Sequence, residues 1–187
     1  TGEAEFGEVF FENVHVPRED LLGEENQGWK IAMAAASFER GTYFIPRLVR
    51  FAQELQQIRE LAQRADAYGR VPAASAAVRQ RWARLAADSH VLALKSQRAL
   101  AGAMRGDPPG PEGSSTKIHW SEAHQRLLEL SLQLLGEAAC VAAGPADPRA
   151  AGLVHAYLWS RAETILAGTS EIQRNIIAEQ MLGLPKA

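Results

Sequence analysis

Apolar residues recur every three or four positions through most of the sequence after Gly28. This interval brings them to one face of an α-helix, and each such face must be buried against another element. The first stretch of this kind predicts a helix of about 35 residues. Pro46 lies within it, removes a backbone donor and crowds the preceding turn, and therefore predicts a bend or break. The positions predicted on its inner face are Ile31, Ala35, Phe38, Thr42, Ile45, Val49, Ala52, Leu55 and Ile58.

Stretches rich in glycine and proline separate this helix from those that follow. Residues 65–75 and 106–111 indicate loops. Asp147 followed by Pro148 is a helix start signal, and Ser170 with a glutamine three residues later has the spacing of a capping box. The sequence therefore predicts an all-α fold, an antiparallel up-down bundle of about four long helices with a short C-terminal helix. The helices predicted after the first are residues 76–104, 115–135, 148–166 and a last one that begins at 170 and ends before 183.

The opening of the sequence has a different pattern. Residues 6–16 are rich in aromatic and β-branched types, alternate in part and end at Pro17, which predicts a β-strand. A single strand cannot bury itself, so we expect it to belong to the sheet of a preceding domain. The chain accordingly divides into the end of a β-domain with its linker, residues 1–23, and a helical-bundle domain, residues 24–187.

The composition excludes several classes of protein. Apolar residues make up 47% of the chain and charged residues 22%, as in soluble globular domains and unlike disordered ones. The formal net charge of −2 supplies no basic field of the kind that attracts a nucleic acid backbone. No uninterrupted apolar run reaches the roughly 18 residues of a membrane span, and the acidic first residues do not resemble a leader.

Cysteine and histidine indicate neither a disulfide framework nor a metal centre. Cys140 is the single cysteine, which excludes an internal disulfide and a multi-cysteine zinc cluster and favours the cytoplasm. His119 and His124 are five positions apart, whereas two metal ligands on one helix face are three or four apart. We therefore predict no metal site.

Two segments resemble parts of a known family. Residues 167–179, Ala-Gly-Thr-Ser-Glu-Ile-Gln-Arg-Asn-Ile-Ile-Ala-Glu, with Leu-Gly-Leu-Pro at 182–185, resemble the C-terminal signature of the acyl-CoA dehydrogenases. Residues 14–30, with Val-His-Val-Pro, Leu-Leu-Gly-Glu and Gly-Trp-Lys, are similar to that family's passage from its middle β-domain into its first C-terminal helix. The resemblance covers nearly the whole chain and accounts for the isolated strand.

The resemblance implies a reaction, the α,β-dehydrogenation of an acyl-CoA thioester to the trans-2-enoyl-CoA. A carboxylate removes the α-proton while the β-hydrogen leaves as hydride to FAD, because no side chain can accept a hydride. A dry pocket raises the pKa of such a carboxylate and strengthens it as a base. The resemblance also implies an acceptor like the electron-transfer flavoproteins for the electrons that the flavin collects.

The position of the catalytic base departs from the commonest pattern of the family. There a glutamate directly precedes the Gly-Thr of the signature, but Ala167 stands at that position and cannot take a proton. In a minority that includes the isovaleryl-type and long-chain-type enzymes, the base precedes an arginine on the first C-terminal helix, as Glu39 precedes Arg40. The resemblance thus implies Glu39 as the base and Arg40 and Gly168 as substrate-binding residues. The alternative is that Glu39 and Arg40 are solvated helix residues.

Four positions match the family's contacts with its flavin. Thr169 and Glu171 lie in the turn and first turn of the last helix, where Thr169 is also suited to capping that helix. Gln133 and Gly136 are similar to a Gln-x-x-Gly-Gly stretch that approaches the cofactor of a neighbouring subunit. The second glycine of that stretch is Glu137 in this chain.

Three functions stay open from the sequence. The first is an active dehydrogenase, for which the minority base position suggests a branched or bulky acyl-CoA. The second is a non-catalytic subunit that pairs with an active relative, and the third is a helical interaction module without chemistry. Glu39 favours the first over the second, and the retained turn at residues 168–174 argues against the third. Apolar bundle faces are consistent with a homo-oligomer, a dimer or tetramer, or a heteromer with a related subunit.

Overall fold

The structure is a computed structural model that describes residues 1–187 except residues 5, 40–43, 67, 109, 142–147 and 187. The side chains of residues 38, 39 and 141 are likewise not described. In the described residues, short 3₁₀ turns precede α1 (η1, Arg18–Asp20) and α3 (η3, Pro72–Ala74), and a π-helical turn (η4, Ile177–Met181) follows α7. The α-helices are α1 Gly28–Glu39, α2 Ile45–Gln63, α3 Ala76–Met104, α4 Glu112–Leu135, α5 Ala138–Val141, α6 Pro148–Glu163 and α7 Ser170–Ile176.

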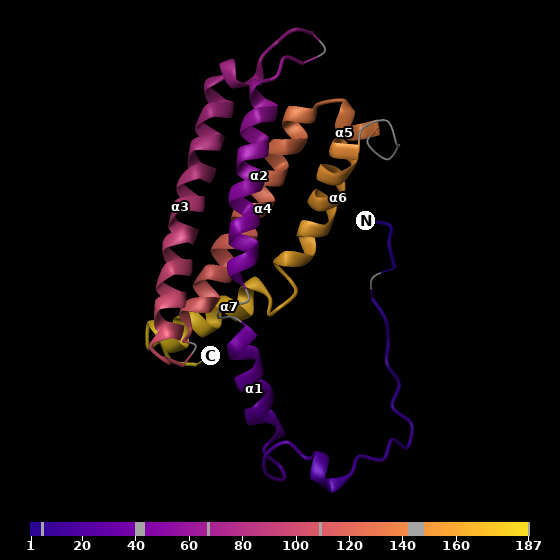
Figure 1. Ribbon diagram of the computed structural model, residues 1–187, viewed down its shortest axis with the longest axis vertical. Helices are drawn as coiled ribbons and strands as arrows, with labels where there is room; N and C mark the ends of the chain where they lie inside the picture. The colour runs from indigo at the N-terminus through magenta and orange to yellow at the C-terminus, as the bar shows by residue number, and fades with distance from the viewer. Residues whose placement is uncertain (5, 40–43, 67, 109, 142–147, 187) are drawn as a thin grey trace.

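Four long helices, α2, α3, α4 and α6, form a bundle in which consecutive members run in opposite directions (Figure 1). The helix α4 packs against α2, α3 and α6, and also against the short α7. It therefore forms the centre of the bundle and carries the largest group of buried residues. The predicted all-α bundle with four long helices and a short C-terminal helix is confirmed.

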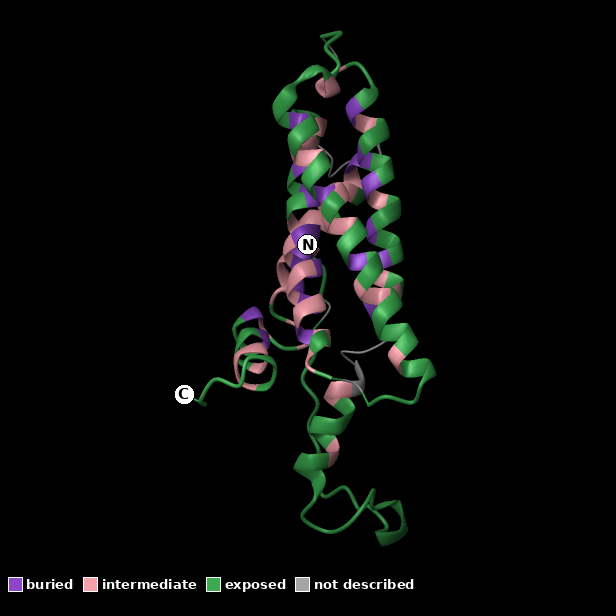
Figure 2. Cartoon of the chain, turned by 90° about the vertical axis from the view of Figure 1, so that its left-hand side faces the viewer, coloured by how far each residue is buried: buried purple, intermediate pink, exposed green. Residues whose placement is uncertain are grey.

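The core lies on the inward faces of α2, α3 and α4, as the buried positions in Figure 2 show. On α2, Leu48 and Phe51 are buried at the helical interval. Each such side chain contributes about 1.5–3 kcal/mol when it leaves water. Val49 and Ala52, which the sequence places on the inner face, are exposed instead. The other core residues are Phe44, Leu55, Ile58, Leu85, Leu92, Trp120, Ala123, Leu127, Leu128 and Leu130.

The first predicted helix is two helices, α1 and α2, and the break falls near Pro46 as expected. Phe44 precedes the first residue of α2, and Pro46 lies in the first turn of that helix. Proline is tolerated there because its missing N–H would have had no partner within the helix. The inner face predicted for one continuous helix does not hold across the two, since Ala35 of α1 is exposed as well as Val49 of α2. Thr42 lies outside the described residues.

The other helix boundaries are close to the predicted ones. The bounds of α3 match, α4 begins three residues earlier than predicted, and α6 ends three residues earlier, at Glu163. After Glu163 the amides of Ile165 and Leu166 both donate to the carbonyl of Ala162, which tightens the helix end into a turn. Asp147, the predicted cap of α6, lies outside the described residues.

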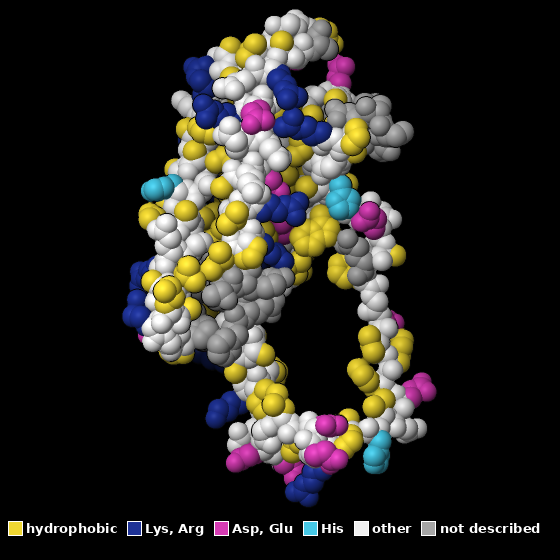
Figure 3. Space-filling view, viewed as in Figure 1, with side chains coloured by type: hydrophobic (Ala, Val, Ile, Leu, Met, Phe, Trp, Pro, Cys, Tyr) yellow, Lys and Arg dark blue, Asp and Glu magenta, His cyan; other side chains and the backbone are white. Residues whose placement is uncertain are grey.

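The described residues of segment 6–16 form no strand. They are exposed, with Phe6 at 91%, Phe10 at 78% and Phe11 at 80% of their full accessible surface. Figures 1 and 3 show this segment as an extended arm beside the bundle, with hydrophobic side chains along it. A strand forms only when its backbone pairs with a neighbour, and no described residue pairs with the backbone of the arm as a strand. The assignment of residues 1–23 to a β-domain stays a prediction.

Within the described ranges, no helix combines the length and the hydropathy that crossing a bilayer requires. The same ranges hold no group of three or more histidine, cysteine, aspartate or glutamate side chains arranged to bind a metal ion. Cys140 is exposed and is not part of a disulfide.

Candidate functional site

One buried stretch of α4 is contacted by two segments that are far apart in the sequence. The ring of Trp120 packs against Phe44, just before α2, with ring centroids 5.6 Å apart. One helical turn earlier, Lys117 Nζ donates a hydrogen bond to the carbonyl oxygen of Gly168 at 2.8 Å. Lys117 and Trp120 are 0% and 3% exposed. The start of α2 and the turn before α7 therefore meet on neighbouring positions of α4, at the lower end of the bundle in Figure 1.

The turn before α7 has an unusual backbone. Ala167 and Gly168 both have positive φ, 53° and 86°. A residue with a side chain costs about 1 kcal/mol or more in this left-handed region, so Ala167 is held there by its surroundings. The side-chain amide of Gln173 donates to the carbonyls of Ala167 and Gly168, at 2.8 and 3.4 Å. Together with Lys117, this buried glutamine fixes the two carbonyls of the turn.

Replacement of Gly168 by alanine tests how tightly the turn is built. The added Cβ would lie 2.5 Å from Gln173 Nε2, and φ would stay at +86°. We expect the free energy of unfolding to fall by about 1–2 kcal/mol, measured by chemical denaturation. Gly152→Ala is the matched control, because Gly152 lies inside α6 with no atom near the new Cβ, and this change should stabilise by up to about 1 kcal/mol. A Gly168→Ala variant as stable as the wild type would contradict this account.

The cap of α7 is Thr169, one residue before the predicted Ser170. The Oγ1 of Thr169 accepts a hydrogen bond from the amide of Ile172 at 3.3 Å. Ser170 is the first helical residue, and its hydroxyl is buried with no partner among the described residues. The predicted capping box is therefore wrong by one residue. The reason is a contact across the turn. The amide of Ser170 donates to the carbonyl of Thr164, so Ser170 becomes the first residue of the helix.

Glu171 is exposed beside this cap. Hydrogen bonds to its own backbone amide and to the Thr169 hydroxyl, with the nearby charges of Arg174 and Lys117, hold the pKa of Glu171 below its ordinary value. The carboxylate is therefore ionised and held near Thr169. Half-buried Thr169 and exposed Glu171, two of the four residues matched to flavin contacts, thus closely follow Gly168, whose carbonyl accepts from Lys117.

The same turn carries main-chain donors without partners. In the described part of the chain, nothing accepts a hydrogen bond from the amides of Ala167, Gly168 or Thr169. Gly168 is exposed and its two neighbours are half-buried. Three consecutive amides are thus available to a ligand with hydrogen-bond acceptors.

Glu39 is the last residue of α1, and its side chain is not described. Arg40 lies outside the described residues. Phe44, five residues after Glu39 in the sequence and directly before α2, contacts Trp120. Phe44 and the turn before α7 therefore reach the same stretch of α4.

Gln133 and Gly136 lie at the other end of α4. Sixteen residues separate Gln133 from Lys117, which is about 24 Å along a helix. The Gln133 side-chain carbonyl accepts a hydrogen bond from the Arg81 guanidinium, and Gly136 ends α4 with a φ of 57°. Within one chain these two residues do not join the turn before α7.

A buried polar cluster was not predicted from the sequence. Its centre is His124, whose Nδ1 lies 2.8 Å from Glu163 Oε2 on α6 and whose Nε2 lies 2.9 Å from Glu54 Oε2 on α2. The imidazole also stacks on Trp120, with centroids 5.7 Å apart. A signal existed in the sequence, because His124 follows Lys117 by seven residues and therefore shares its inward face of α4.

The cluster carries charge inside the bundle. Burial opposes protonation of His124, but hydrogen bonds and charges from Glu163 and Glu54 outweigh it and raise the pKa of His124 to about 9. Burial likewise opposes ionisation of Glu54, yet His124 and Arg50 lower its pKa below the ordinary value. For Lys117, burial is the larger effect and lowers its pKa, against the charges of nearby carboxylates. At neutral pH a protonated imidazole therefore ties α2 and α6 to α4.

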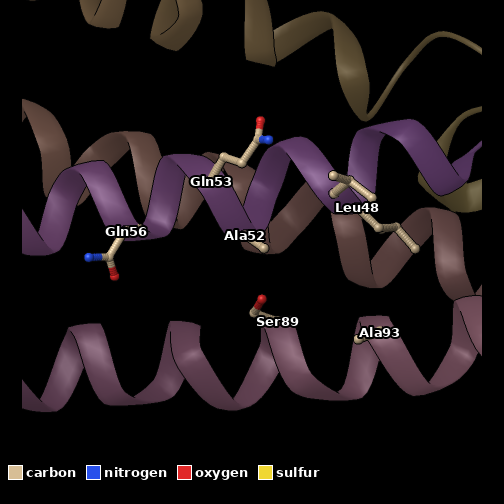
Figure 4. A pocket seen from close by; sticks show the side chains of 7 residues that line it. Leu48, Ala52, Gln53, Gln56, Ser89 and Ala93 are labelled. Atoms are coloured by element: carbon tan, nitrogen blue, oxygen red, sulfur yellow. The ribbon is translucent and has the colours of Figure 1, made fainter.

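A groove lies elsewhere, between α2 and α3 (Figure 4). It is open and mostly apolar, and none of the predicted site residues lines it. Its lining includes no titratable side chain, so it has no acid or base to offer and nothing to activate the Ser89 hydroxyl. Its lining residues are Leu48, Val49, Ala52, Gln53, Gln56, Ser89 and Ala93.

Comparison with known proteins identifies relatives of the chain. The family model described as acyl-CoA dehydrogenase, C-terminal domain, matches residues 26–182. The acyl-CoA dehydrogenase IpdE1 of Mycobacterium tuberculosis is 35% identical over 190 residues, which cover 100% of this chain and 46% of that protein.

Solved structures share the fold. The ChsE4–ChsE5 complex from Mycobacterium tuberculosis matches with a TM-score of 0.72 and 27% identity over 95% of this chain and 46% of that one. The glutaryl-coenzyme A dehydrogenase complex with glutaryl-CoA matches with a TM-score of 0.79 and 20% identity, over 95% of this chain and 44% of that one. The chain thus spans somewhat under half the length of these relatives.

Proposed function

Because the chain belongs to the acyl-CoA dehydrogenase family, we propose that the complete protein oxidises an acyl-CoA thioester to the trans-2-enoyl-CoA. The substrate loses a proton from its α-carbon and a hydride from its β-carbon. FAD, when bound, is the acceptor of that hydride. The chain described here supplies the base and part of the walls of the site.

The base is Glu39. The observation that carries this assignment is that the start of α2 and the turn at Ala167 contact the same buried stretch of α4, through Phe44 and Gly168. Glu39 precedes Phe44 by five residues in the sequence, which supports a carboxylate close to the turn where most family members carry theirs. Ala167 has no group that can take a proton, which leaves this role to another residue.

Arg40 and Gly168 bind the substrate. Gly168 offers an exposed backbone at which an acyl thioester approaches closely, since no side chain stands in the way. Arg40 follows the base directly and gives a cationic group to shape the pocket or hold the carboxylate. The position of the base on the first helix, rather than in the turn, favours a branched or bulky acyl group.

Thr169 and Glu171 hold the flavin from one chain, and Gln133 with Gly136 approach the flavin of a second subunit. The donor set fits the hydrogen-bond acceptors of a flavin, because three free amides at residues 167–169 and the Thr169 hydroxyl lie together. The separation of about 24 Å between the two ends of α4 supports the division between subunits. FAD is thus shared across an interface of the assembly.

The assembly is a homo-oligomer, a dimer or tetramer, or a heteromer with a related subunit. Exposed apolar side chains on described helices, among them Val49, Leu94 and Leu158, support burial against another chain. One solved relative is a complex of two different chains. The electrons leave to an acceptor like the electron-transfer flavoproteins, and the compartment is the cytoplasm.

The test uses the complete protein that contains this chain. Purified protein should carry FAD, seen by its visible absorbance, and a panel of linear and branched acyl-CoAs should bleach that absorbance under anaerobic conditions. Protein that binds FAD but is bleached by no acyl-CoA would contradict the dehydrogenase assignment.

Ala167 supports a second candidate, a non-catalytic subunit that completes the flavin site of an active relative. Under that alternative the protein gains activity only with its partner, and replacement of Glu39 leaves the activity of the pair unchanged. A helical interaction module without chemistry is less well supported, because such a module has no need of the Gly168 turn with its buried lysine contact.

A further inference from the structure

Lys117 is an exceptional residue in the bundle. Its side chain is 0% exposed, although lysine is seldom fully buried without a partner. Its hydrogen bond is to the carbonyl oxygen of Gly168, 51 residues later in the sequence, at 2.8 Å. A methionine would fill similar space without the cost of desolvating an ammonium group. The charge therefore has a use that packing does not explain.

The contact acts on one peptide unit. The carbonyl of Gly168 and the amide of Thr169 belong to the same peptide group, which is trans. In a trans peptide the C=O and N–H bonds point in opposite directions. Because the carbonyl points inward to Lys117, the Thr169 N–H points away from α4. This amide has no acceptor among the described residues.

The ammonium group also changes the strength of that donor. A cation bound to the carbonyl oxygen draws electron density from the peptide and makes its N–H a stronger hydrogen-bond donor. The Lys117 end of this contact is buried, where water screens the charge less than it does at the surface.

We infer that Lys117 is a positioning residue, which fixes the Gly168–Thr169 peptide and polarises its N–H toward the bound flavin. The inference rests on the proposed function for its flavin, but the position of the peptide is a property of this chain. Gln173 assists, since its side-chain amide donates to the preceding carbonyl, that of Ala167, and more weakly to that of Gly168.

The test compares three variants of the complete protein, Lys117→Met, Lys117→Gln and Lys117→Arg, with Lys95→Met as control. Lys95 is the matched choice, because it is part-buried and its Nζ also donates to a backbone carbonyl, that of Ser115, but it does not contact the turn. Two quantities are measured. One is amide hydrogen exchange over residues 164–173 by mass spectrometry, and the other is the midpoint potential of the bound flavin.

Lys117→Met should raise the exchange rate of the Ser170 and Gln173 amides on the order of tenfold and make the potential more negative. Lys95→Met should change neither. The neutral donor in Lys117→Gln should restore much of the protection but not the potential, whereas Lys117→Arg, which keeps the charge, should restore the potential in part.

Unchanged exchange over residues 164–173 in Lys117→Met, or an equal increase in Lys95→Met, would overturn the inference. If the methionine variant does not fold, Lys117→Gln is compared with the wild type instead. A flavin potential in Lys117→Gln equal to that of the wild type would show that Lys117 does not polarise the peptide. Hydrogen exchange is measured whether or not any acyl-CoA reduces the flavin. A failure of the proposed reaction is therefore distinguishable from a failure of this inference.

Discussion

Replacement of Glu39 by glutamine is expected to slow the reduction of bound flavin by an acyl-CoA by roughly a hundred- to ten-thousandfold. This is the range that one positioned general base contributes to a rate. Glutamine has nearly the same shape but cannot take the α-proton, so FAD and substrate should still bind. The measurement is stopped-flow bleaching of the flavin absorbance under anaerobic conditions, with the best acyl-CoA of the panel.

Glu60→Gln is the control for this experiment, because Glu60 is an exposed glutamate on the neighbouring helix α2. It should leave the rate within twofold or so of the wild type, as surface substitutions away from a site do. Equal bleaching by wild type and Glu39→Gln would show that Glu39 is not the base.

A second variant tests whether a base at residue 39 and a base at residue 167 reach the same substrate pocket. In the double variant Glu39→Gln with Ala167→Glu, the carboxylate returns to the turn that Lys117 and Gln173 hold. We expect part of the lost bleaching rate to return. Full recovery is not expected, since a base displaced by as little as about 1 Å can lose roughly a hundredfold in rate.

Replacement of His124 by glutamine is expected to lower the free energy of unfolding by about 3–5 kcal/mol, the usual effect of removing one partner from a buried ionic group. The change leaves Glu54 and Glu163 inside the bundle without the cation that both contact. Chemical denaturation of the complete protein at pH 7 measures it. His119→Gln is the control, because its pair with Asp88 is part-exposed, and it should cost no more than about 1 kcal/mol.

The pH dependence of stability follows from the same cluster. The pKa of His124 is raised from 6.5 to about 9 in the folded protein. The contribution of His124 to the free energy of unfolding is therefore complete below about pH 6.5 and is lost as the pH rises through about 9. One pKa unit corresponds to about 1.4 kcal/mol, so the loss is about 3 kcal/mol. The lowered pKa of Glu54 acts at acidic pH. There stability is lost as the pH falls below 4.5, the ordinary pKa of a glutamate.

Unfolding free energies at pH 5.5, 7, 8.5 and 10 measure this dependence. In His124→Gln the decline between pH 7 and pH 10 should be much smaller than in the wild type. An equal decline in both proteins would show that other groups cause it.

The cluster and the turn differ in how far they could be predicted. The sequence predicts the turn that begins at Gly168, because this glycine and the helix signal at Ser170 lie close together in the sequence. Its cap was misplaced by one residue, since the choice between Thr169 and Ser170 depends on a hydrogen bond from Ser170 to Thr164 across the turn. For Glu39, the sequence provides the candidate, and its role stays a prediction.

By itself the sequence determined where the helices of this protein form and where they break. Those features depend on neighbouring residues, such as Pro46 at the start of α2 and the glycines and prolines after α3. Only the tertiary structure decided which faces turn inward. It buried Leu48 and Phe51 in place of Val49 and Ala52, and it brought Lys117 to Gly168 and His124 to Glu54 and Glu163. These pairings join residues 39 to 70 positions apart. They depend on how each helix is rotated about its axis. Helix packing sets that rotation, and local periodicity does not encode it.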